Sequence, residues 1–304
     1  MIELIDAVKV YKNGVTALDH VSFTVEPGDF IFVVGESGAG KSTLIKLLTC
    51  EERVNSGKVF LDGCDLAQLS RRMVPSLRRK IGMIFQDFRL IEGKTVFENV
   101  AFAMEIIGTK PEMIKRRVPL VLSQVGLRTK TNMYTDELSG GEAQRLGIAR
   151  AIVNNPSLIL ADEPTGNLDP INGEAIMALL ECINLEGTTV IACTHDKNLV
   201  DRMAKRVIEF SNGKLIRDAC NATYSDKHRC PEVSEKREIN QRQSANICDN
   251  YEHTERIPDQ QEQIRIPQIK DMERCILEAH KRRADRREGR QMEQDKTHWT
   301  DLGE

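Results

Sequence analysis

A glycine-rich segment near the start of the chain carries the residues best suited to bind phosphate. The segment Gly35-Glu36-Ser37-Gly38-Ala39-Gly40-Lys41-Ser42, with Thr43 beside it, fits the pattern G-x-x-x-x-G-K-[ST] and follows a continuously apolar run. Its glycines let successive backbone N–H groups point at phosphate oxygens, and a helix that begins there adds a partial positive charge. Lys41 would reach the β and γ phosphates of a nucleotide, and the Ser42 hydroxyl would bind Mg²⁺. The alternative is a chance glycine-rich turn, which the flanking strand and helix patterns disfavour.

Two adjacent carboxylates end a second apolar run, Leu158-Ile159-Leu160-Ala161-Asp162-Glu163. Asp162 is placed to hold the magnesium ion through its water shell, and Glu163 to orient or deprotonate an attacking water. A strand that ends in two acids can also be only a solvated strand end. The phosphate loop in the same chain favours the catalytic interpretation.

A third motif, Leu138-Ser139-Gly140-Gly141-Glu142, lies between these two. Its residues predict a loop that opens a helix, with Ser139 as the cap and Glu142 three residues later. The two glycines expose backbone N–H groups, so this is a second helix start able to bind an anion. From these residues alone, a well-capped helix without further function is the favoured interpretation.

The order of these motifs resembles that of the ATP-binding cassette (ABC) family, over residues 1 to about 218. The Leu-Ser-Gly-Gly-Glu motif separates that family from other phosphate-loop ATPases; Ala143 departs from it, since Gln commonly follows the Glu. The resemblance implies an ATPase that uses ATP and Mg²⁺ and works as a dimer with two ATP molecules between the subunits. It also implies roles for individual residues: Tyr11 stacks on adenine; Gln86 senses Mg²⁺ and a membrane partner; Ser139, Gly140 and Gly141 contact the γ-phosphate bound by the opposite subunit; Asp169 lies in the loop between the two sites; and His195 holds the γ-phosphate and the catalytic water.

A finer resemblance, through Arg78 to Phe88 and Thr95 to Ala101, is to the cell-division branch of this family. It implies an integral membrane partner, a peripheral position on the cytoplasmic side of a bacterial membrane, and control of cell-wall hydrolysis rather than solute movement. The alternative is an ATPase for lipoprotein release or small-molecule export, a branch that shares Ala161 to Asp169. A soluble ABC protein acting on ribosomes or DNA, and a regulatory module that only binds nucleotide, fit less well.

The segments around the motifs predict the α/β architecture that would position them. Near-alternate apolar residues over 2–10 and 20–25 indicate an antiparallel layer, whereas the runs 30–34, 158–161 and 190–193 are typical of buried parallel strands. Helical spacing indicates a helical subdomain over about 87–138, inserted in the domain. We therefore expect an ABC-type nucleotide-binding domain over 1–218, with a mostly parallel RecA-like sheet, an antiparallel layer and this helical subdomain.

Composition changes beyond about residue 219. Apolar residues become sparse there, so residues 219–304 are expected to form a charged and largely disordered extension. A basic run after Leu277 could contact anionic lipid. With a net charge of −3 and no apolar run of membrane-spanning length, the 304-residue chain predicts neither a nucleic-acid binder nor a membrane-spanning protein.

Two smaller expectations complete the sequence analysis. Six large apolar residues between positions 88 and 102 are more than a small helical subdomain easily buries. They are Phe88, Leu90, Ile91, Val96, Phe97 and Phe102. This excess of apolar residues predicts a docking surface for the membrane partner around Gln86 to Phe102, in the groove between the sheet core and the helical subdomain. The alternative is that most of these side chains belong to the core and only one or two are exposed. The eight cysteines, none in a C-x-x-C pair, are expected to be reduced thiols.

Overall fold

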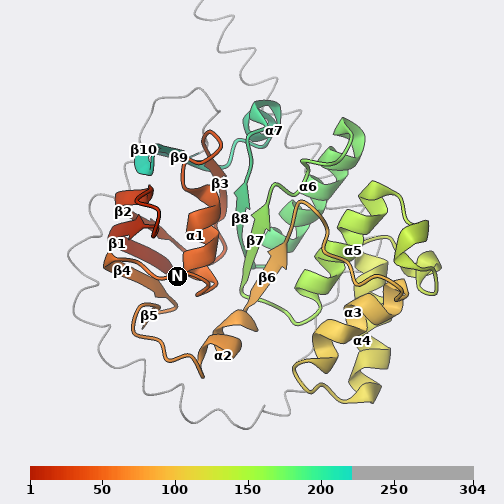
Figure 1. The fold of residues 1–304 in the computed structure, drawn as a ribbon. Coiled ribbons are helices and arrows are strands. Elements are labelled where there is room, and N and C mark those ends of the chain that lie inside the picture. The colour runs from red at the N-terminus through yellow and green to blue at the C-terminus, as the bar shows by residue number, and fades with distance from the viewer. Residues whose placement is uncertain (221–304) are drawn as a thin grey trace, which may run out of the picture. The chain divides into compact units, whose positions relative to one another are not determined.

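The computed structural model of the protein describes residues 1–220. Contacts divide the chain into residues 1–263 and 264–304, and every described residue belongs to the first unit. The predicted charged extension and its lipid contact therefore lie outside the described residues. Two sheets and the helices around them form the described part (Figure 1).

A six-stranded sheet with the order β10-β9-β3-β8-β7-β6 forms the centre. Its strands are β3 (Phe30–Val34), β6 (Ile81–Ile84), β7 (Leu158–Asp162), β8 (Thr189–Cys193), β9 (Arg206–Ser211) and β10 (Lys214–Ala219). All neighbours are parallel except β9 and β10. The three predicted apolar runs are strands, and all of their apolar residues are buried because helices or a second sheet cover both faces.

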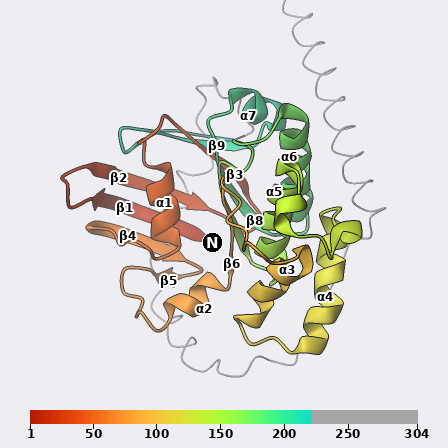
Figure 2. The ribbon, with the colours of Figure 1, turned by 45° about the vertical axis from the view of Figure 1, so that its right-hand side comes forward.

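The antiparallel layer is a four-stranded sheet of order β2-β1-β4-β5. It consists of β1 (Ile2–Val10), β2 (Thr16–Val25), β4 (Ser56–Leu61) and β5 (Cys64–Asp65). The pair β1 and β2 agrees with prediction, although β2 begins four residues earlier than its apolar pattern. Helix α1 (Lys41–Leu48) lies between the two sheets (Figure 2), and its Leu44, Ile45 and Leu48 join both sheets in one core cluster.

The chain between β6 and β7 is helical apart from its connecting loops. It holds α3 (Val96–Glu105), α4 (Pro111–Gln124), two 3-10 turns (Arg128–Lys130 and Thr135–Glu137) and α5 (Gly140–Ile152). Helix α3 begins at a capping box in which Thr95 and Glu98 satisfy each other's backbone N–H groups. Helix α5 packs against both α3 and β6, so it joins the helical segment to the sheet. The remaining helices are α2 (Val74–Arg78), α6 (Pro170–Leu185) and α7 (Lys197–Met203).

The cysteine expectation is only partly right. Cys50 and Cys193 are free thiols. Cys220, however, is disulfide-bonded. The expectation was wrong for this residue because local spacing was the only guide to pairing, and a disulfide requires closeness in space rather than in sequence.

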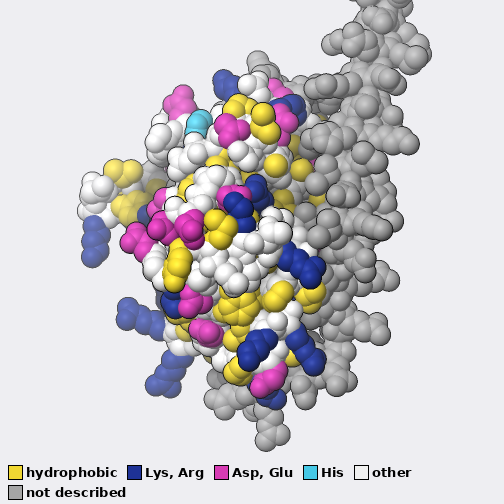
Figure 3. Space-filling model, turned by 90° about the vertical axis from the view of Figure 1, so that its right-hand side faces the viewer, with side chains coloured by type: hydrophobic (Ala, Val, Ile, Leu, Met, Phe, Trp, Pro, Cys, Tyr) yellow, Lys and Arg dark blue, Asp and Glu magenta, His cyan; other side chains and the backbone are white. Residues whose placement is uncertain are grey.

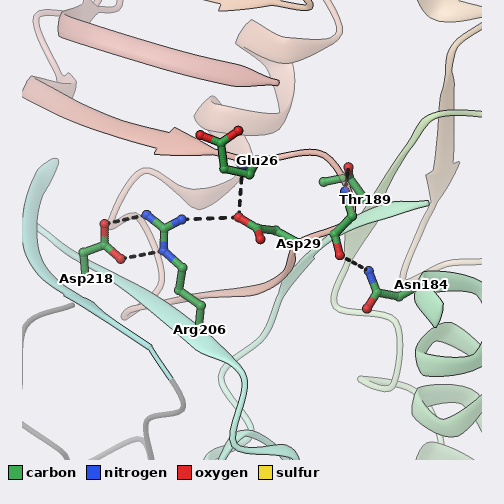
Figure 4. Close-up of polar contacts among 7 residues, drawn as sticks. Glu26, Asp29, Asn184, Thr189, Arg206 and Asp218 are labelled. Atoms are coloured by element: carbon green, nitrogen blue, oxygen red, sulfur yellow. Dashed lines mark hydrogen bonds and ion pairs between the residues drawn. The ribbon is translucent and has the colours of Figure 1, made fainter. Parts of the chain in front are cut away.

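An ionic network holds the edge of the central sheet at which its strands begin (Figure 4). The Arg206 guanidinium donates to both carboxylate oxygens of Asp218, at 2.8 and 2.7 Å, and lies 3.5 Å from Asp29. Asp29 in turn accepts from the Glu26 backbone N–H at 2.9 Å. Since Arg206 and Asp218 are only 12% and 14% exposed, their charges depend on each other rather than on water. The network therefore fastens β9 and β10 to the turn that leads into β3.

Replacing Arg206 should test this fastening. We expect Arg206→Met to lower the free energy of unfolding by about 3 kcal/mol, because Asp218 would keep its charge without a partner. Urea unfolding measures the change. Lys214→Met is the matched control: its ion pair with Asp19 is exposed and should contribute less than about 1 kcal/mol. Equal effects of the two substitutions would contradict a special role for the network.

Candidate active site

The loop between β3 and α1 depends on glycines with left-handed backbone. Gly35, Gly38 and Gly40 have φ values of 145°, 79° and 117°. A Cβ at Gly35 would lie 2.3 Å from the Phe210 carbonyl oxygen, and one at Gly40 would lie 2.5 Å from that of Ala17. These two positions exclude every other residue, so the sheets on both sides set the path of the loop.

Lys41 and Tyr11 lie next to this loop. The Lys41 amino group donates to the carbonyl oxygens of Gly35, at 2.6 Å, and Glu36, at 3.0 Å. The Tyr11 hydroxyl is 3.2 Å from the Thr43 hydroxyl, so β1 brings the predicted adenine-binding residue to the first turn of α1. Glu36, Ser37 and Gly38 are exposed, as is Ser42. The loop therefore presents its outer residues and the Ser42 hydroxyl to solvent, where a nucleotide would bind.

The two carboxylates at the end of β7 differ in their surroundings. Burial raises the pKa of Asp162, repulsion by Glu163 raises it further, and the nearby Lys41 charge opposes both. Glu163 has a left-handed backbone with φ of 48°, which turns its side chain away from the strand direction. Its Oε1 lies 2.8 Å from Nδ1 of His195, a residue that follows β8. Two parallel strands thus bring an acid and an imidazole together, although they are 32 residues apart in the sequence.

Gln86 lies two residues beyond β6 and contacts the turn after Glu163. Its backbone carbonyl accepts from Asn167 Nδ2 at 2.9 Å, and its side-chain Nε2 is 3.5 Å from Asn167 Oδ1. Gly166 also faces this side chain, since a Cβ there would lie 2.9 Å from Gln86 Nε2. Asp169, three residues after Gly166, caps α6 by accepting from the backbone N–H groups of Ile171 and Asn172, both at 3.1 Å. Gln86 and Asp169 therefore belong to one connected group of loops.

The Ser-Gly-Gly-Glu helix start is part of a different surface. Glu142 accepts from the Ser139 backbone N–H at 3.0 Å and pairs with Lys130 at 2.6 Å, and these two partners lower the pKa of Glu142 to about 2. Gly141 faces Asn172, whose Oδ1 would lie 2.5 Å from a Cβ at that glycine. In Figures 1 and 2, α5 lies on the opposite side of β7 and β8 from α1. Within residues 1–220, no hydrogen bond joins Ser139–Gly141 to the phosphate loop.

Three contributing residues have no assigned role in the sequence analysis. Gln144 is 1% exposed and donates to the Pro164 carbonyl at 2.7 Å, so α5 supports the turn that carries Glu163. The Asn167 side chain donates to the Gln86 backbone carbonyl, and the Asn172 side chain donates to the Asp169 carboxylate at 2.6 Å. The only sequence signal for the role of Gln144 is a polar residue at a core position of the helix. The sequence gives no signal for the roles of Asn167 and Asn172, because contacts between loops have no periodicity.

The available ligands fit Mg²⁺ better than a transition metal. In residues 1–220, no three His, Cys, Asp or Glu side chains form a cluster that could hold a metal ion. The three residues predicted to hold the metal would offer oxygen: the Ser42 hydroxyl, the Asp162 carboxylate and the Gln86 side-chain carbonyl. Mg²⁺ prefers oxygen ligands and commonly binds through one carboxylate, several waters and substrate phosphates.

A glycine-rich phosphate loop at the end of β3, acids at the end of β7 and a histidine after β8 define a phosphate-loop ATPase. The comparisons with known proteins agree. The family model described as ABC transporter matches residues 18–166. The cell division ATP-binding protein FtsE of Bacillus subtilis is 51% identical over 224 residues, which cover 74% of this chain and 98% of that protein. The protein of the same name from Escherichia coli is 49% identical over 207 residues, which cover 68% of this chain and 93% of that protein.

Solved structures show the same relationship. The ATP-binding cassette MJ0796, in a dimeric post-hydrolysis state with ADP and Pi, is similar with a TM-score of 0.67 and 35% identity. The match covers 74% of this chain and all of MJ0796. The chain therefore belongs to the ABC transporter family of ATP-binding proteins, within the group named FtsE. As a member, it binds ATP and is an ATPase.

The low pKa of Glu142 predicts how this helix start depends on pH. Because the folded-state pKa lies below the ordinary value of 4.5, the charge contributes stability above about pH 4.5 and loses that contribution as the pH falls toward 2. Glu142→Gln should lower the unfolding free energy by about 1 kcal/mol at pH 7. The difference from the unmodified protein should shrink below about pH 4.5. Urea unfolding at pH 7, 5 and 4 measures both effects.

Glu112→Gln, in the exposed first turn of α4, is the control for this measurement. It should change stability by less than about 0.5 kcal/mol at each pH. A Glu142→Gln effect that is constant with pH would show that the carboxylate charge contributes nothing.

Proposed function

We propose that two copies of this chain bind two ATP molecules between them and drive an integral membrane partner, as the ATPase of an FtsX-containing cell-division complex that regulates cell-wall hydrolysis. One observation carries the dimer: the Ser139–Gly141 helix start lies away from the chain's own phosphate loop, so the Gly140 and Gly141 N–H groups can face a nucleotide held by another copy. The dimeric state of MJ0796 supports this arrangement. The names of the relatives support the cell-division role over the export alternative.

Within each site, we assign the phosphates to residues 35–43 and the adenine ring to Tyr11. Lys41 exchanges its contacts with the Gly35 and Glu36 carbonyls for the β and γ phosphates. Mg²⁺ neutralises phosphate charge when bound, and Ser42, Asp162 and Gln86 would hold it. Residues 139–141 of the second copy bind the γ-phosphate from the other side, with the Gly140 and Gly141 backbone N–H groups as donors.

Hydrolysis is assigned to Glu163 and His195. Glu163 orients the attacking water and accepts its proton. His195, 2.8 Å from Glu163, is placed to hold the same water and the γ-phosphate. Loss of the γ-phosphate removes the charge that both copies bind, so the dimer loosens, and Asp169 lies where the loops of the two sites would meet. This alternation between closed and open dimers is the work that the membrane partner receives.

We place the protein on the cytoplasmic face of the bacterial membrane as a peripheral subunit. No helix within residues 1–220 is long and apolar enough to cross a bilayer. Whether the basic run after Leu277 contacts anionic lipid concerns residues outside the described range, and it remains a prediction. The domain limits, 1–218 for the ATPase domain and about 87–138 for its helical subdomain, are also proposed.

The docking surface for the partner is proposed at residues 86–102, beside the helical segment. Of its six apolar side chains, Val96 is fully buried and belongs to the core, whereas Phe102 is 38% exposed and the others are half-buried. Further exposed apolar residues extend this surface over α3 and α4: Ile106, Met113 and Leu120. The face on the right of Figure 1, seen directly in Figure 3, shows hydrophobic side chains among charged ones. A partner bound here would touch the same loop that carries Gln86.

Glu163→Gln tests the catalytic assignment. The substitution should lower kcat by about 10²–10⁴-fold while leaving ATP affinity intact, because a positioned proton acceptor typically contributes that much. With ATP and Mg²⁺, the variant should elute as a dimer in size-exclusion chromatography. Unchanged turnover would remove Glu163 from the role, and a monomer at saturating ATP would contradict the shared site.

Leu90→Glu tests the docking surface. A buried charge at the interface should abolish binding to membranes that contain the partner, and ATP binding by the isolated subunit should remain normal. Membrane fractionation and calorimetry measure the two effects. Ile216→Glu, at an exposed position on β10, is the control and should still bind the membranes. Wild-type recruitment of Leu90→Glu would place the docking surface elsewhere.

A further inference from the structure

The segment directly after Gln86 has a strained backbone. Phe88 and Arg89 have left-handed φ values of 57° and 46°, although neither is a glycine. The Arg89 backbone N–H donates to the Asp87 carbonyl at 2.6 Å, which closes a tight turn. Bulky residues adopt this backbone rarely, and they keep it only when their surroundings hold them there.

The Arg150 side chain, from the last part of α5, holds this turn. Its guanidinium donates from Nη2 to the Phe88 carbonyl at 2.8 Å and from Nη1 to the Arg89 carbonyl. Gly147, one helical turn earlier on α5, faces the same turn, since a Cβ there would lie 3.7 Å from the Phe88 carbonyl oxygen, an ordinary contact distance. Burial lowers the pKa of Arg150, yet an arginine stays charged at neutral pH, so both hydrogen bonds have a cationic donor.

Helix α5 also supports the loop after Glu163, which Gln86 contacts. Gln144 donates to the Pro164 carbonyl, next to Glu163, and Asn167 connects that loop to the Gln86 carbonyl. Helix α5 thus holds the loop after Glu163 through Gln144, and the segment after Gln86 through Arg150. Gln86 lies between these two attachments.

We infer that Arg150 is a positioning residue for ATP hydrolysis: by holding the Phe88 and Arg89 carbonyls, it keeps Gln86 at the active-site edge in register with the helix that begins at Ser139. This inference rests on the proposed role of Gln86. Because α5 begins with the γ-phosphate-binding residues proposed above, Arg150 links the position of Gln86 in one site to the helix start that serves the other site.

Arg117 provides a matched control. It is also a buried arginine that donates to the backbone near the end of α5, through bonds to the Val153 carbonyl and the Asn155 side chain. It comes from α4, however, and its hydrogen bonds do not reach residues 86–91. Loss of Arg117 should therefore weaken the packing of the helical segment without releasing the turn.

The experiment compares Arg150→Met, Arg150→Lys and Arg117→Met in the full chain. Arg150→Met should lower kcat about tenfold with the KM for ATP within about twofold of wild type, since misplacement of a positioned group by about 1 Å can cost up to about 100-fold in rate. Hydrogen exchange should rise in residues 86–91 and stay unchanged in 140–149. Arg150→Lys, which keeps a cation able to reach one carbonyl, should recover part of the lost kcat and part of the lost exchange protection in residues 86–91. Arg117→Met should lower the Tm without these two changes.

A double variant separates this inference from the proposed function. If Arg150 acts through Gln86, Arg150→Met should lower kcat little further in a Gln86→Ala background. Normal turnover by Gln86→Ala alone would contradict the proposed role of Gln86. Wild-type kcat and wild-type exchange in 86–91 for Arg150→Lys and Arg150→Met would overturn the inference about Arg150, as would equal effects of Arg150→Met and Arg117→Met on kcat.

Discussion

The parallel pairing of β3 with β8 and of β8 with β7 determines where the phosphate loop, the two acids at the end of β7 and His195 lie. Parallel strands end at the same edge of a sheet, so the phosphate loop after β3, the acids after β7 and His195 after β8 must converge. The pairing requires all three strands to be apolar on both faces, which is why each reads as a continuous hydrophobic run. The ionic network around Arg206 lies at the opposite edge of the sheet, where Arg206 pairs with Asp218 and with Asp29, the residue before β3. By fixing the start of β3, this network also fixes where the phosphate loop begins.

Helix α5 adds the second level of organisation. The sheet can align groups that follow its own strands, but it cannot align Gln86 with the loop that carries Asn167, because both segments leave the strand direction. Gln144 and Arg150 supply that alignment from one rigid element. Rigid support of this kind limits the error in the position of a catalytic side chain better than loop contacts alone.

Much of the fold could be predicted because its signals are local. The runs 30–34, 158–161 and 190–193 are strands, and Ser139 and Glu142 form the predicted capping arrangement. The strands β9 and β10 were not predicted: Glu209 and Arg217 interrupt their apolar patterns, and these two charges compensate each other across the neighbouring strands. The contacts of Gln86, Asn167 and Arg150 were also hidden, since they join segments more than 60 residues apart through backbone carbonyls that any residue offers.

The position of β3 in the sheet has a consequence for how the chain folds as it is made. This strand leaves the ribosome early, but its hydrogen-bonding partners on both sides come late: Phe30 pairs with Val190, and Ile31 with Arg206. At typical synthesis rates of about 5–20 residues per second, β3 waits for about 10–30 s with both edges unpaired. During that time the antiparallel sheet and α1, whose residues are complete by Asp65, can cover one of its apolar faces. The antiparallel sheet and α1 can thus reduce the apolar surface that β3 exposes to aggregation during synthesis.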